Sequence, residues 1–478
     1  MRLFRPAIGF MIFLLSAFAL PQAARADVSF SRDIAPIVLK RCAGCHGERA
    51  NLGGYRAHTF QSLMRAGESG QAAIVAGKPD DSVFFQRISM KVEPLRMPKS
   101  DDPLSTAQIA LIRQWIAAGA KFDGADAALP LKNLLGPRVH PAAPAVYRTP
   151  VPVMALTFAP DGKEIYIGGY NEITVWNAGT GALLKRIPRQ PQRIQALAFS
   201  PDGKTLLVAG GTPGEYGEIA LVHPDSGARQ VFDTFNDIAL AAVFSPDGKH
   251  ILAGGADGGV RMYDAGSGKR LWESKVHSDW VTGVSMSFDN RFVVSSSKDR
   301  TVKVYEAETG SLFTTYNGHN RQIGTYKGAA PVYAVQFAPG SDTVYSAGGG
   351  KWIQIWDPIQ AQAESGDAGD QEERFAKQGA ARYIPLGFTQ EVYALSVQDG
   401  QVFAASADGI LKQFDAKTFQ EVRAFTGHTD WIFSLNYHAP TRRIATGGYD
   451  GAVRVWDAQT GACLASFKAM PGHIATGP

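Results

Sequence analysis

The chain has 478 residues, of which 45% are hydrophobic and 10% aromatic, so it can bury more than one core and is not disordered as a whole. Its formal net charge is +4, with lysine and arginine scattered among aspartate and glutamate. Because no basic stripe stands out, we expect no nucleic acid among its partners.

Residues 1–26 have the features of a secretory signal peptide. Arg2 and Arg5 precede the apolar run IGFMIFLLSAFAL at 8–20, and the small-x-small triplet ARA follows at 24–26. A membrane anchor is the alternative, but this run is shorter than the ~20 residues that span a bilayer. We therefore expect export to the periplasm, with cleavage after Ala26 and no stable membrane span afterwards. Cleavage removes three arginines and no acid, so the formal charge falls from +4 to +1.

Residues 27–123 show helical patterning. Ser31 can cap a helix that leads towards Cys42, and shorter helices are expected over 59–65 and 82–88. Ser105 and Gln108 form a capping-box pattern before a final helix that stops at Gly119. The apolar face of that helix holds Ile109, Ile112, Trp115 and Ile116. The pattern predicts a small all-α domain, followed by a proline- and alanine-rich linker over 124–150.

The stretch RCAGCHG at 41–47 carries the chemistry of this first domain. On one helical turn, Cys42 and Cys45 can bond the two vinyl groups of a porphyrin, and His46 can reach the iron. A dithiol redox pair would favour a βαβ context, and a zinc site would need two further ligands at similar spacing. The motif therefore predicts one covalent haem c with His46 as the proximal ligand.

The distal ligand is predicted less directly. Met97 precedes Pro98 in EPLRMPKSDDP, a segment that cannot easily be helical and could hold a thioether over the haem. His58, Met64 and Met90 are the alternatives, with Met64 and Met90 expected mainly as core side chains, and another group or an open site also stays possible.

The first domain resembles the planctomycete-type c-type cytochromes. The matching pieces are FSRDIAPIVLKRCAGCHG, IVAGKPDDSVFFQRI, the RMP loop and IALIRQWIAAGA, in that order. The resemblance implies a class I-like cytochrome c fold and one-electron transfer. It carries over to Cys42, Cys45, His46 and Met97 only.

After residue 150 the sequence repeats. Short strands that end in a WD-like dipeptide begin at Ile173, Ile219, Val260, Val302, Ile353, Leu411 and Val453. Seven such units resemble the WD-repeat family, so we expect an all-β seven-bladed propeller of four-stranded blades over 151–470. The final strand ACLASFKAM could complete the last blade, or residues 145–150 could add a strand to it. Two insertions, 316–330 and 361–380, are expected as longer connections, the second as an exposed loop.

The WD resemblance also implies a buried hydrogen-bond tetrad in the best-preserved unit, formed by His428, Thr446, Asp450 and Trp456. The fourth unit matches in part, with His277, Ser295, Asp299 and Tyr305 in these places, whereas the third has Asp257 but Ala253. His319 also falls near a blade entry, where a structural role is expected. Cys463 is expected as a buried free thiol.

Together the two domains predict a multidomain periplasmic electron-transfer protein. A His/Met haem has no open position for a substrate, so the propeller is expected to dock a redox partner protein, and no catalytic residue is assigned. Two alternatives stay open. The propeller could hold a substrate site and pass electrons to the haem, as an oxidoreductase, or the chain could be a haem-based sensor.

Overall fold

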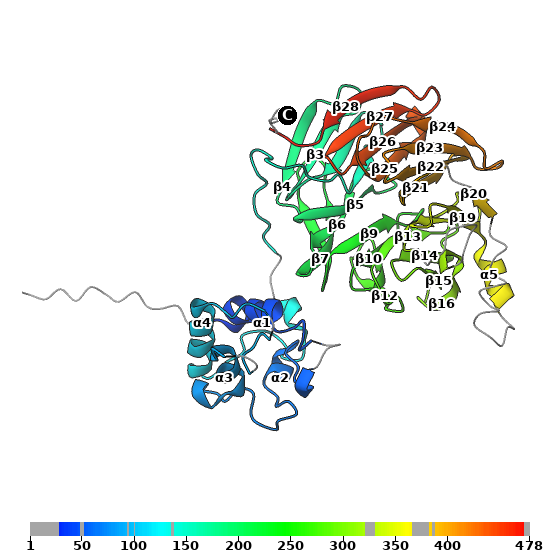
Figure 1. Ribbon diagram of the computed structural model, residues 1–478. Coiled ribbons are helices and arrows are strands. Elements are labelled where there is room, and N and C mark those ends of the chain that lie inside the picture. Colours follow the sequence, from blue (N-terminus) through cyan, green and yellow to red (C-terminus); the bar gives the residue numbers. More distant parts are fainter. Residues whose placement is uncertain are drawn as a thin grey trace, which may run out of the picture. The chain divides into compact units, whose positions relative to one another are not determined.

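The computed structural model describes residues 28–47, 52–92, 95–99, 101–134, 138–320, 330–365, 382–384 and 388–472. The chain forms two compact units, residues 1–136 and 137–478. The first is helical and the second is a seven-bladed β-propeller, which confirms the predicted fold class (Figure 1). The predicted signal peptide lies outside the described residues. None of the described helices is both long and apolar enough to cross a membrane.

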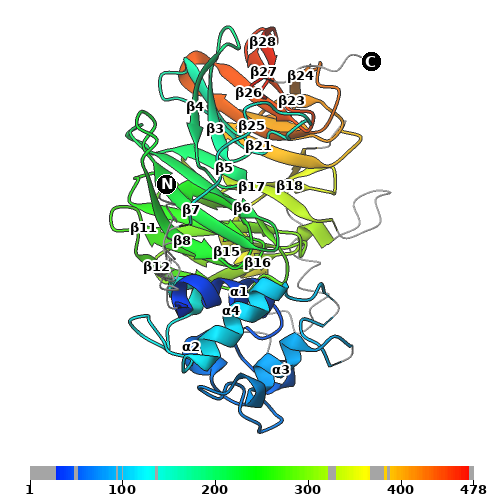
Figure 2. The same ribbon diagram turned by 90° about the vertical axis from the view of Figure 1, so that its left-hand side faces the viewer.

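The helical unit is built from short helices around one apolar core. They are η1 (Phe30–Ile34), α1 (Ala35–Arg41), η2 (Leu52–Gly54), α2 (Phe60–Leu63), η3 (Pro79–Asp81), α3 (Val83–Ser89), α4 (Thr106–Ala117) and η4 (Leu131–Leu134). Helix α4 packs against η1 and α3. Figure 2 shows α4 and α3 next to each other. Its buried face holds Ile112, Trp115 and Ile116, and the capping box of Ser105 and Gln108 is present, as predicted.

The predicted helix start at Ser31 is wrong. Ser29 caps η1, and its hydroxyl accepts the backbone N–H of Arg32. The hydroxyl of Ser29 also donates to Asp123 at 2.5 Å, and the backbone N–H of Ser31 donates to the same carboxylate at 2.8 Å. A partner 94 residues away in sequence therefore anchors the start of the helical unit.

The propeller consists of seven four-stranded antiparallel sheets, each made of consecutive strands. Blade 1 holds β1 (Leu156–Phe158), β2 (Glu164–Gly168), β3 (Glu172–Asn177) and β4 (Leu183–Pro188). Blade 2 holds β5 (Arg193–Phe199), β6 (Leu206–Thr212), β7 (Tyr216–Val222) and β8 (Arg229–Phe235). Blade 3 holds β9 (Ala239–Phe244), β10 (His250–Gly255), β11 (Val260–Asp264) and β12 (Arg270–Ser274). Blade 4 holds β13 (Val281–Met286), β14 (Phe292–Ser297), β15 (Val302–Glu306) and β16 (Leu312–Tyr316).

The last three blades follow the same order. Blade 5 holds β17 (Val332–Phe337), β18 (Val344–Gly348), β19 (Ile353–Trp356) and β20 (Arg382–Ile384). Blade 6 holds β21 (Val392–Gln398), β22 (Gln401–Ser406), β23 (Leu411–Asp415) and β24 (Glu421–Phe425). Blade 7 holds β25 (Ile432–His438), β26 (Arg443–Gly448), β27 (Ala452–Asp457) and β28 (Cys463–Lys468). All seven predicted WD-like strands are the third strands of their blades.

The ring closes through its first strands. Each first strand lies against the first strands of the two neighbouring blades, and β25 meets β1. Strand β28 completes blade 7, so the final strand of the chain supplies the fourth strand of its own blade. Apolar side chains of the first strands are buried between adjacent sheets, which explains why these strands pack closely around the ring.

The proline-rich segment before the propeller is tied down at both ends. In the helical unit, Leu131 is fully buried and its N–H donates to the carbonyl of His58 at 2.8 Å. In the propeller unit, His140 and Tyr147 are buried against blades 2 and 1. Apolar and aromatic side chains thus fix parts of a segment that its composition alone predicts to be a linker.

The two insertions are described in part. Residues 318–320 form η5 (Gly318–Asn320), and 321–329 lie outside the described residues. Helix α5 (Pro358–Ser365) begins the second insertion, and 366–381 lie outside. Cys463 is exposed on the outer strand β28, so its prediction as a buried thiol is wrong. The fourth strand of a blade is the outermost, which leaves its side chains open to solvent.

Candidate functional site

The Cys-x-x-Cys-His stretch follows directly after α1. Cys42 is the C-cap residue of that helix, and its N–H donates to the carbonyl of Val38 at 2.9 Å. Backbone N–H groups of Cys45 and His46 both donate to the carbonyl of Cys42, at 3.2 and 2.9 Å. One tight turn therefore holds the two thiols and the imidazole.

The two cysteines differ in exposure. Cys42 is partly buried against the helical core, whereas Cys45 is exposed. Burial raises the pKa of the Cys42 thiol to about 12. Because a reactive dithiol needs a thiolate of lowered pKa, this environment disfavours a redox pair and suits a neutral, covalently modified sulfur.

His46 is oriented by a backbone carbonyl. Its Nδ1 lies 3.2 Å from the carbonyl oxygen of Tyr55. A carbonyl can only accept, so Nδ1 must carry the proton and Nε2 keeps its lone pair. The Tyr55 ring packs edge-on against the imidazole with ring centroids 5.4 Å apart, and its hydroxyl donates to the carbonyl of Leu63 at 2.7 Å. Such a partner on the second ring nitrogen is typical of a metal-binding histidine.

Met97 lies in a loop that is fastened to the rest of the helical unit. Its N–H donates to the carbonyl of Arg87 at 3.0 Å, and its side chain packs against the helical core. Arg41, next to Cys42 in sequence, forms an ion pair with Asp101 at 3.2 Å and donates to the carbonyl of Asp102. The end of α1 and the segment after Met97 are therefore joined directly.

The three alternative distal ligands have different surroundings. Met64 packs against the helical core, as expected, whereas Met90 is partly exposed. The Nδ1 atom of His58 is buried and has no hydrogen-bond partner among the described residues. A covalent haem fits this donor set, because one turn holds two thiols and an oriented imidazole, and a second segment contributes the partly buried thioether of Met97.

The predicted tetrad of blade 7 is formed only in part. His428 Nε2 lies 2.8 Å from the hydroxyl of Thr446, which also accepts the indole N–H of Trp456 at 2.9 Å. Asp450 instead pairs with Lys468 at 2.5 Å. Burial and, to a smaller extent, nearby Arg454 together lower the pKa of His428 to about 4.

Blade 4 holds the fuller network. His277 Nδ1 lies 2.7 Å from the carboxylate of Asp299, and Nε2 lies 2.7 Å from the hydroxyl of Ser295. The Ser295 hydroxyl lies 3.4 Å from that of Tyr305, which takes the place of tryptophan. Burial lowers the pKa of His277, and Asp299 offsets this only in part.

Blade 5 carries a third such network, of which the sequence pattern gave only His319. His319 Nε2 lies 2.9 Å from the hydroxyl of Ser346, which also accepts the indole N–H of Trp356 at 3.1 Å. Burial lowers the pKa of His319 to about 3. The WD-like IWD in this unit marks Trp356, and a hydroxyl ten residues before it could have completed the pattern.

Blades 1 and 2 contain buried ion pairs that sequence reasoning missed. Glu172 receives two bonds from Arg186, at 2.6 and 2.8 Å, and one from the hydroxyl of Tyr147 at 2.5 Å. Glu218 likewise contacts Arg229 and lies 2.8 Å from His140 Nε2.

Blades 3 and 6 hold comparable pairs. In blade 3, Arg261 contacts Asp257 and also Glu273 at 2.8 Å. In blade 6, Lys412 contacts Glu421 at 2.6 Å. In each of these four blades one ion pair joins the third strand to the fourth, namely Glu172–Arg186, Glu218–Arg229, Arg261–Glu273 and Lys412–Glu421.

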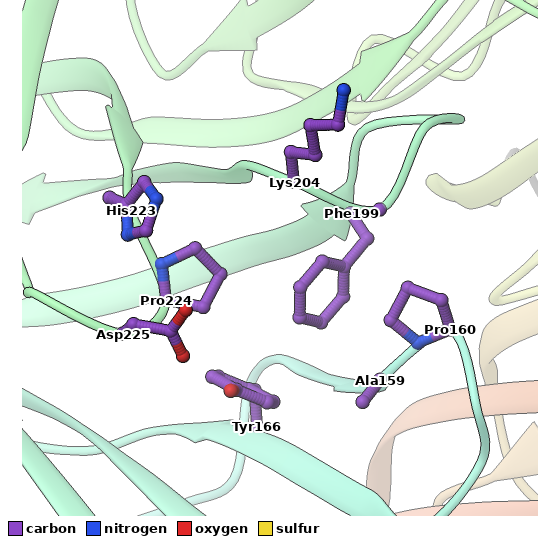
Figure 3. Close-up of a pocket in the computed structure, with 9 residues that line it drawn as sticks. Ala159, Pro160, Tyr166, Phe199, Lys204, His223, Pro224 and Asp225 are labelled. Carbon is purple, nitrogen blue, oxygen red and sulfur yellow. The ribbon is translucent and has the colours of Figure 1, made fainter.

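One hollow lies where turns of blades 1 and 2 meet, with a volume of about 350 Å³. Figure 3 shows Tyr166, Phe199 and Pro160 on its apolar side and His223 and Asp225 on its polar side. Within the described part of the chain, no group of three or more His, Cys, Asp or Glu side chains is arranged to hold a metal ion.

Comparison with known families agrees with both units. Residues 42–101 match the family model described as Planctomycete cytochrome C. Residues 231–264, 268–306, 310–357 and 419–457 match the model described as WD domain, G-beta repeat.

Similar curated proteins cover only part of the chain. Nuclear distribution protein PAC1 of Arthroderma benhamiae is 28% identical over 182 residues, which is 38% of this chain and 36% of that protein. The Ribosome biogenesis protein WDR12 homolog of Oryza sativa subsp. japonica is 27% identical over 263 residues, which is 50% of this chain and 58% of that protein. THO complex subunit 6 of Arabidopsis thaliana is 34% identical over 76 residues, or 16% and 21%. The chain thus spans about a third of the length of the first of these relatives. Taken with the fold, the family matches make the N-terminal unit a planctomycete-type cytochrome c domain and the second unit a WD-repeat propeller.

Proposed function

We propose that this protein is a periplasmic mono-haem c-type cytochrome that transfers electrons, with its propeller as the docking scaffold for a redox partner protein. The observation that carries the proposal is the bond of His46 Nδ1 to the carbonyl of Tyr55. It leaves Nε2 available to an iron ion, one residue after the second of two cysteines with haem-attachment spacing. A bound haem would supply a one-electron redox couple.

Each residue has a separate task in this proposal. Cys42 and Cys45 would hold the haem by thioether bonds, and His46 would be its proximal ligand. Met97, held by the carbonyl of Arg87, would be the distal ligand. His46 and Met97 together would leave no position for a substrate, and the thioether of Met97 would favour a higher reduction potential than a second histidine.

Docking is the task proposed for the propeller. WD repeats form a rigid ring with turns at both ends of every blade, and such surfaces suit contacts with other proteins. The matches of the propeller to the WD-repeat family model and to proteins named for nuclear distribution and ribosome biogenesis support this docking role. Export to the periplasm follows from the N-terminal sequence and from the haem attachment motif.

Acidified organic solvent tests the attachment of the haem. The full chain, produced in a host that matures c-type cytochromes, should keep one haem per chain after denaturation and extraction. The double variant Cys42→Ala/Cys45→Ala should lose all haem, whereas Cys463→Ala, the matched control at the exposed third cysteine, should keep it. Haem that leaves the wild-type polypeptide would contradict the proposal.

Carbon monoxide tests the distal ligand. The ferrous wild-type protein should not bind it, whereas Met97→Ala should bind it readily. Met90→Ala is the control, because Met90, unlike Met97, is not among the described side chains that pack against the helical core and should not affect the iron. If His58→Ala opened the iron and Met97→Ala did not, the distal ligand would be His58.

A further inference from the structure

The first strands of blades 5, 6 and 7 each carry an aromatic side chain at a β-bulge. The strand register shifts between the residues that flank Tyr333 in β17, Tyr393 in β21 and Phe433 in β25, so each of these aromatic residues is the bulge residue of its strand. The equivalent bulge residue in β13 is Thr282 and in β5 is Gln195. A bulge redirects a side chain, and bulges are enriched beside functional sites.

These aromatic side chains form one continuous surface. We define the aromatic cluster as Tyr333, Tyr393, Trp431, Phe433 and Tyr449. Ring centroids lie 5.0 Å apart for Tyr333 and Tyr393 and for Tyr393 and Phe433. Trp431 lies 6.0 Å from Phe433 and 5.9 Å from Tyr449.

The outer part of the aromatic cluster is open to solvent. Trp431 keeps 46% of its surface exposed and Tyr449 keeps 49%. Aromatic rings contribute strongly to interfaces, and their gathering on three adjacent blades favours a binding surface over chance exposure.

Blade 4 contains an internal counterpart that indicates the chemistry of the ligand. Trp280 precedes β13 as Trp431 precedes β25, and both follow an aspartate. The N–H of Lys298 donates to the carbonyl of Trp280 at 3.0 Å, just as that of Tyr449 donates to the carbonyl of Trp431 at 2.8 Å. Lys298 thus corresponds to Tyr449, and its ammonium group lies 3.7 Å from the centre of the Trp280 ring. In blade 4 the chain's own lysine covers the tryptophan, whereas blade 7 has a further aromatic ring at that place.

Carboxylates accompany the aromatic cluster. Asp430 is partly exposed, and its Oδ1 accepts the backbone N–H of Trp431 at 2.8 Å. Glu391 accepts the hydroxyl of Tyr393 at 3.0 Å. Lys468, on the same blade as Trp431, is engaged with Asp450 at 2.5 Å. Electron-rich ring faces next to acidic side chains favour a cation.

We propose that the aromatic cluster is the docking site for a lysine-bearing segment of a partner protein. An ammonium group of that segment would lie on the exposed face of Trp431, as Lys298 lies on Trp280, with Asp430 and Glu391 completing the charge. This inference deepens the docking role proposed above and depends on it only for the partner being redox-active.

A labelled peptide tests the proposal on the full haem-loaded chain. The probe is a fluorescein-labelled peptide of alternating lysine and glycine, whose binding is followed by fluorescence anisotropy at low and high salt. Peptides of the same length with acetyl-lysine or glutamate in place of lysine are the controls. We expect the lysine peptide to bind and both controls to bind at least tenfold more weakly, because neither presents a cation. Equal binding of the lysine and acetyl-lysine peptides would overturn the proposal.

Variants locate the site. Trp431→Ala and Tyr449→Lys should each weaken binding of the lysine peptide by about tenfold, the second because it supplies the chain's own lysine to Trp431. Tyr449→Gln, which is neutral, should weaken it less than Tyr449→Lys. Trp280→Ala is the matched control and should leave affinity unchanged. If Trp280→Ala weakened binding as much as Trp431→Ala, the aromatic cluster would not be the site.

Two further measurements separate this inference from the haem proposal. Far-ultraviolet circular dichroism of each variant verifies the propeller fold, and the haem absorbance verifies the cytochrome unit. Loss of peptide binding with both signals unchanged is the expected result for Trp431→Ala. Should wild type bind no lysine peptide while its haem stays covalently attached, the docking inference fails and the cytochrome proposal stands.

Discussion

Two groups of blades solve the same packing problem with different chemistry. Each WD-like segment, from the one that begins at Ile173 in blade 1 to the one that begins at Val453 in blade 7, pairs its second residue with a residue of the neighbouring second strand. At that paired position, blades 4, 5 and 7 place a hydroxyl, from Ser295, Ser346 and Thr446. Blades 1, 2, 3 and 6 place an apolar side chain there, from Ile167, Val208, Ala253 and Ala404. Where the hydroxyl is present, a histidine and an aromatic side chain gather around it.

Blades 1, 2, 3 and 6, which have the apolar side chain, are stabilised by ion pairs instead. Each of these blades joins the third strand to the fourth by an ion pair, and three of these are deeply buried on at least one side. Blades 4 and 5 make hydrogen bonds that involve no carboxylate across the same strands, from the ammonium group of Lys303 to the hydroxyl of Thr315 and from the hydroxyl of Tyr316 to Gln354. All seven blades therefore have the same strand arrangement, but different polar contacts stabilise them. Either kind of contact is adequate as long as the buried polar groups are paired.

The largest effect should come from breaking the ion pair of blade 3. Arg261→Leu removes a guanidinium that is only 4% exposed and that contacts both Asp257 and Glu273. Glu273 then keeps only its contacts with the more exposed Arg270 and Lys275. Breaking a buried pair costs about 3–5 kcal/mol, so the urea midpoint of the propeller should fall sharply. Intrinsic fluorescence follows this unfolding, and haem absorbance reports on the cytochrome unit separately.

Arg270 provides the matched control for that experiment. It also contacts Glu273, at 3.4 Å, but its side chain is 43% exposed. Arg270→Leu should change stability by less than about 1 kcal/mol, because solvent screens exposed pairs. Equal losses in the two variants would show that burial does not set the strength of these pairs.

In the blades that carry the hydroxyl, the loss of stability on removing the histidine should depend on how many hydrogen bonds that histidine makes. His277→Ala in blade 4 removes two hydrogen bonds and leaves Asp299 without its imidazole partner, which should cost about 3 kcal/mol. His428→Ala in blade 7 removes the bond to Thr446 and should cost about half as much. Urea unfolding of both variants at pH 7.5 gives the comparison. A larger loss for His428→Ala would contradict the geometry.

Acid should distinguish the two groups of blades. Burial lowers the pKa of His319 to about 3 and of His428 to about 4, from 6.5. The unfolded chain therefore binds more protons than the folded one below pH 6.5, and stability falls as the pH falls. Between pH 7.5 and pH 5, each of these histidines should lower the free energy of unfolding by up to about 2 kcal/mol.

The ion-pair blades should respond only at lower pH. Burial alone would raise the pKa of Glu218, but His140 and Arg229 hold it below 4.5, and Arg261 likewise holds that of Asp257 below 3.8. Their stabilising effect is complete above these values and is lost only as the pH falls below them. Urea midpoints between pH 7.5 and 4 should therefore decline less steeply in His319→Gln than in wild type. An unchanged slope would mean that His319 does not stay neutral.

The sequence was sufficient for features that depend on local spacing. Seven WD-like strands and the capping box of Ser105 and Gln108 are local patterns, and the structure confirms them. Features that depend on distant partners could not be predicted in this way. Ser29 replaces Ser31 as the helix cap through its bond to Asp123, and His140 meets Glu218 only because a proline-rich segment folds back over blade 2.

The same reason applies to the candidate site. The spacing of Cys42, Cys45 and His46 predicts a haem, but the carbonyl of Tyr55 that orients His46 carries no signal in the sequence. Aromatic residues at the bulges of blades 5 to 7 also pass unnoticed, because strand register alone shows that they share a position.

The smallest effect should be at Asp450, where family resemblance and geometry disagree. If Asp450 were the carboxylate of a buried tetrad, its replacement by asparagine should lower the free energy of unfolding by about 2 kcal/mol or more. In this chain it pairs instead with Lys468, whose side chain is 46% exposed, and the Nδ1 atom of His428 has no hydrogen-bond partner among the described residues. Asp450→Asn should therefore change the free energy of unfolding by about 0.5 kcal/mol, while Asp299→Asn, in the complete network of blade 4, should cost several times more. Parallel urea titrations of the two variants test this prediction. Similar losses would mean that Asp450 accepts a hydrogen bond from His428 in solution and that blades 4 and 7 have the same kind of polar network.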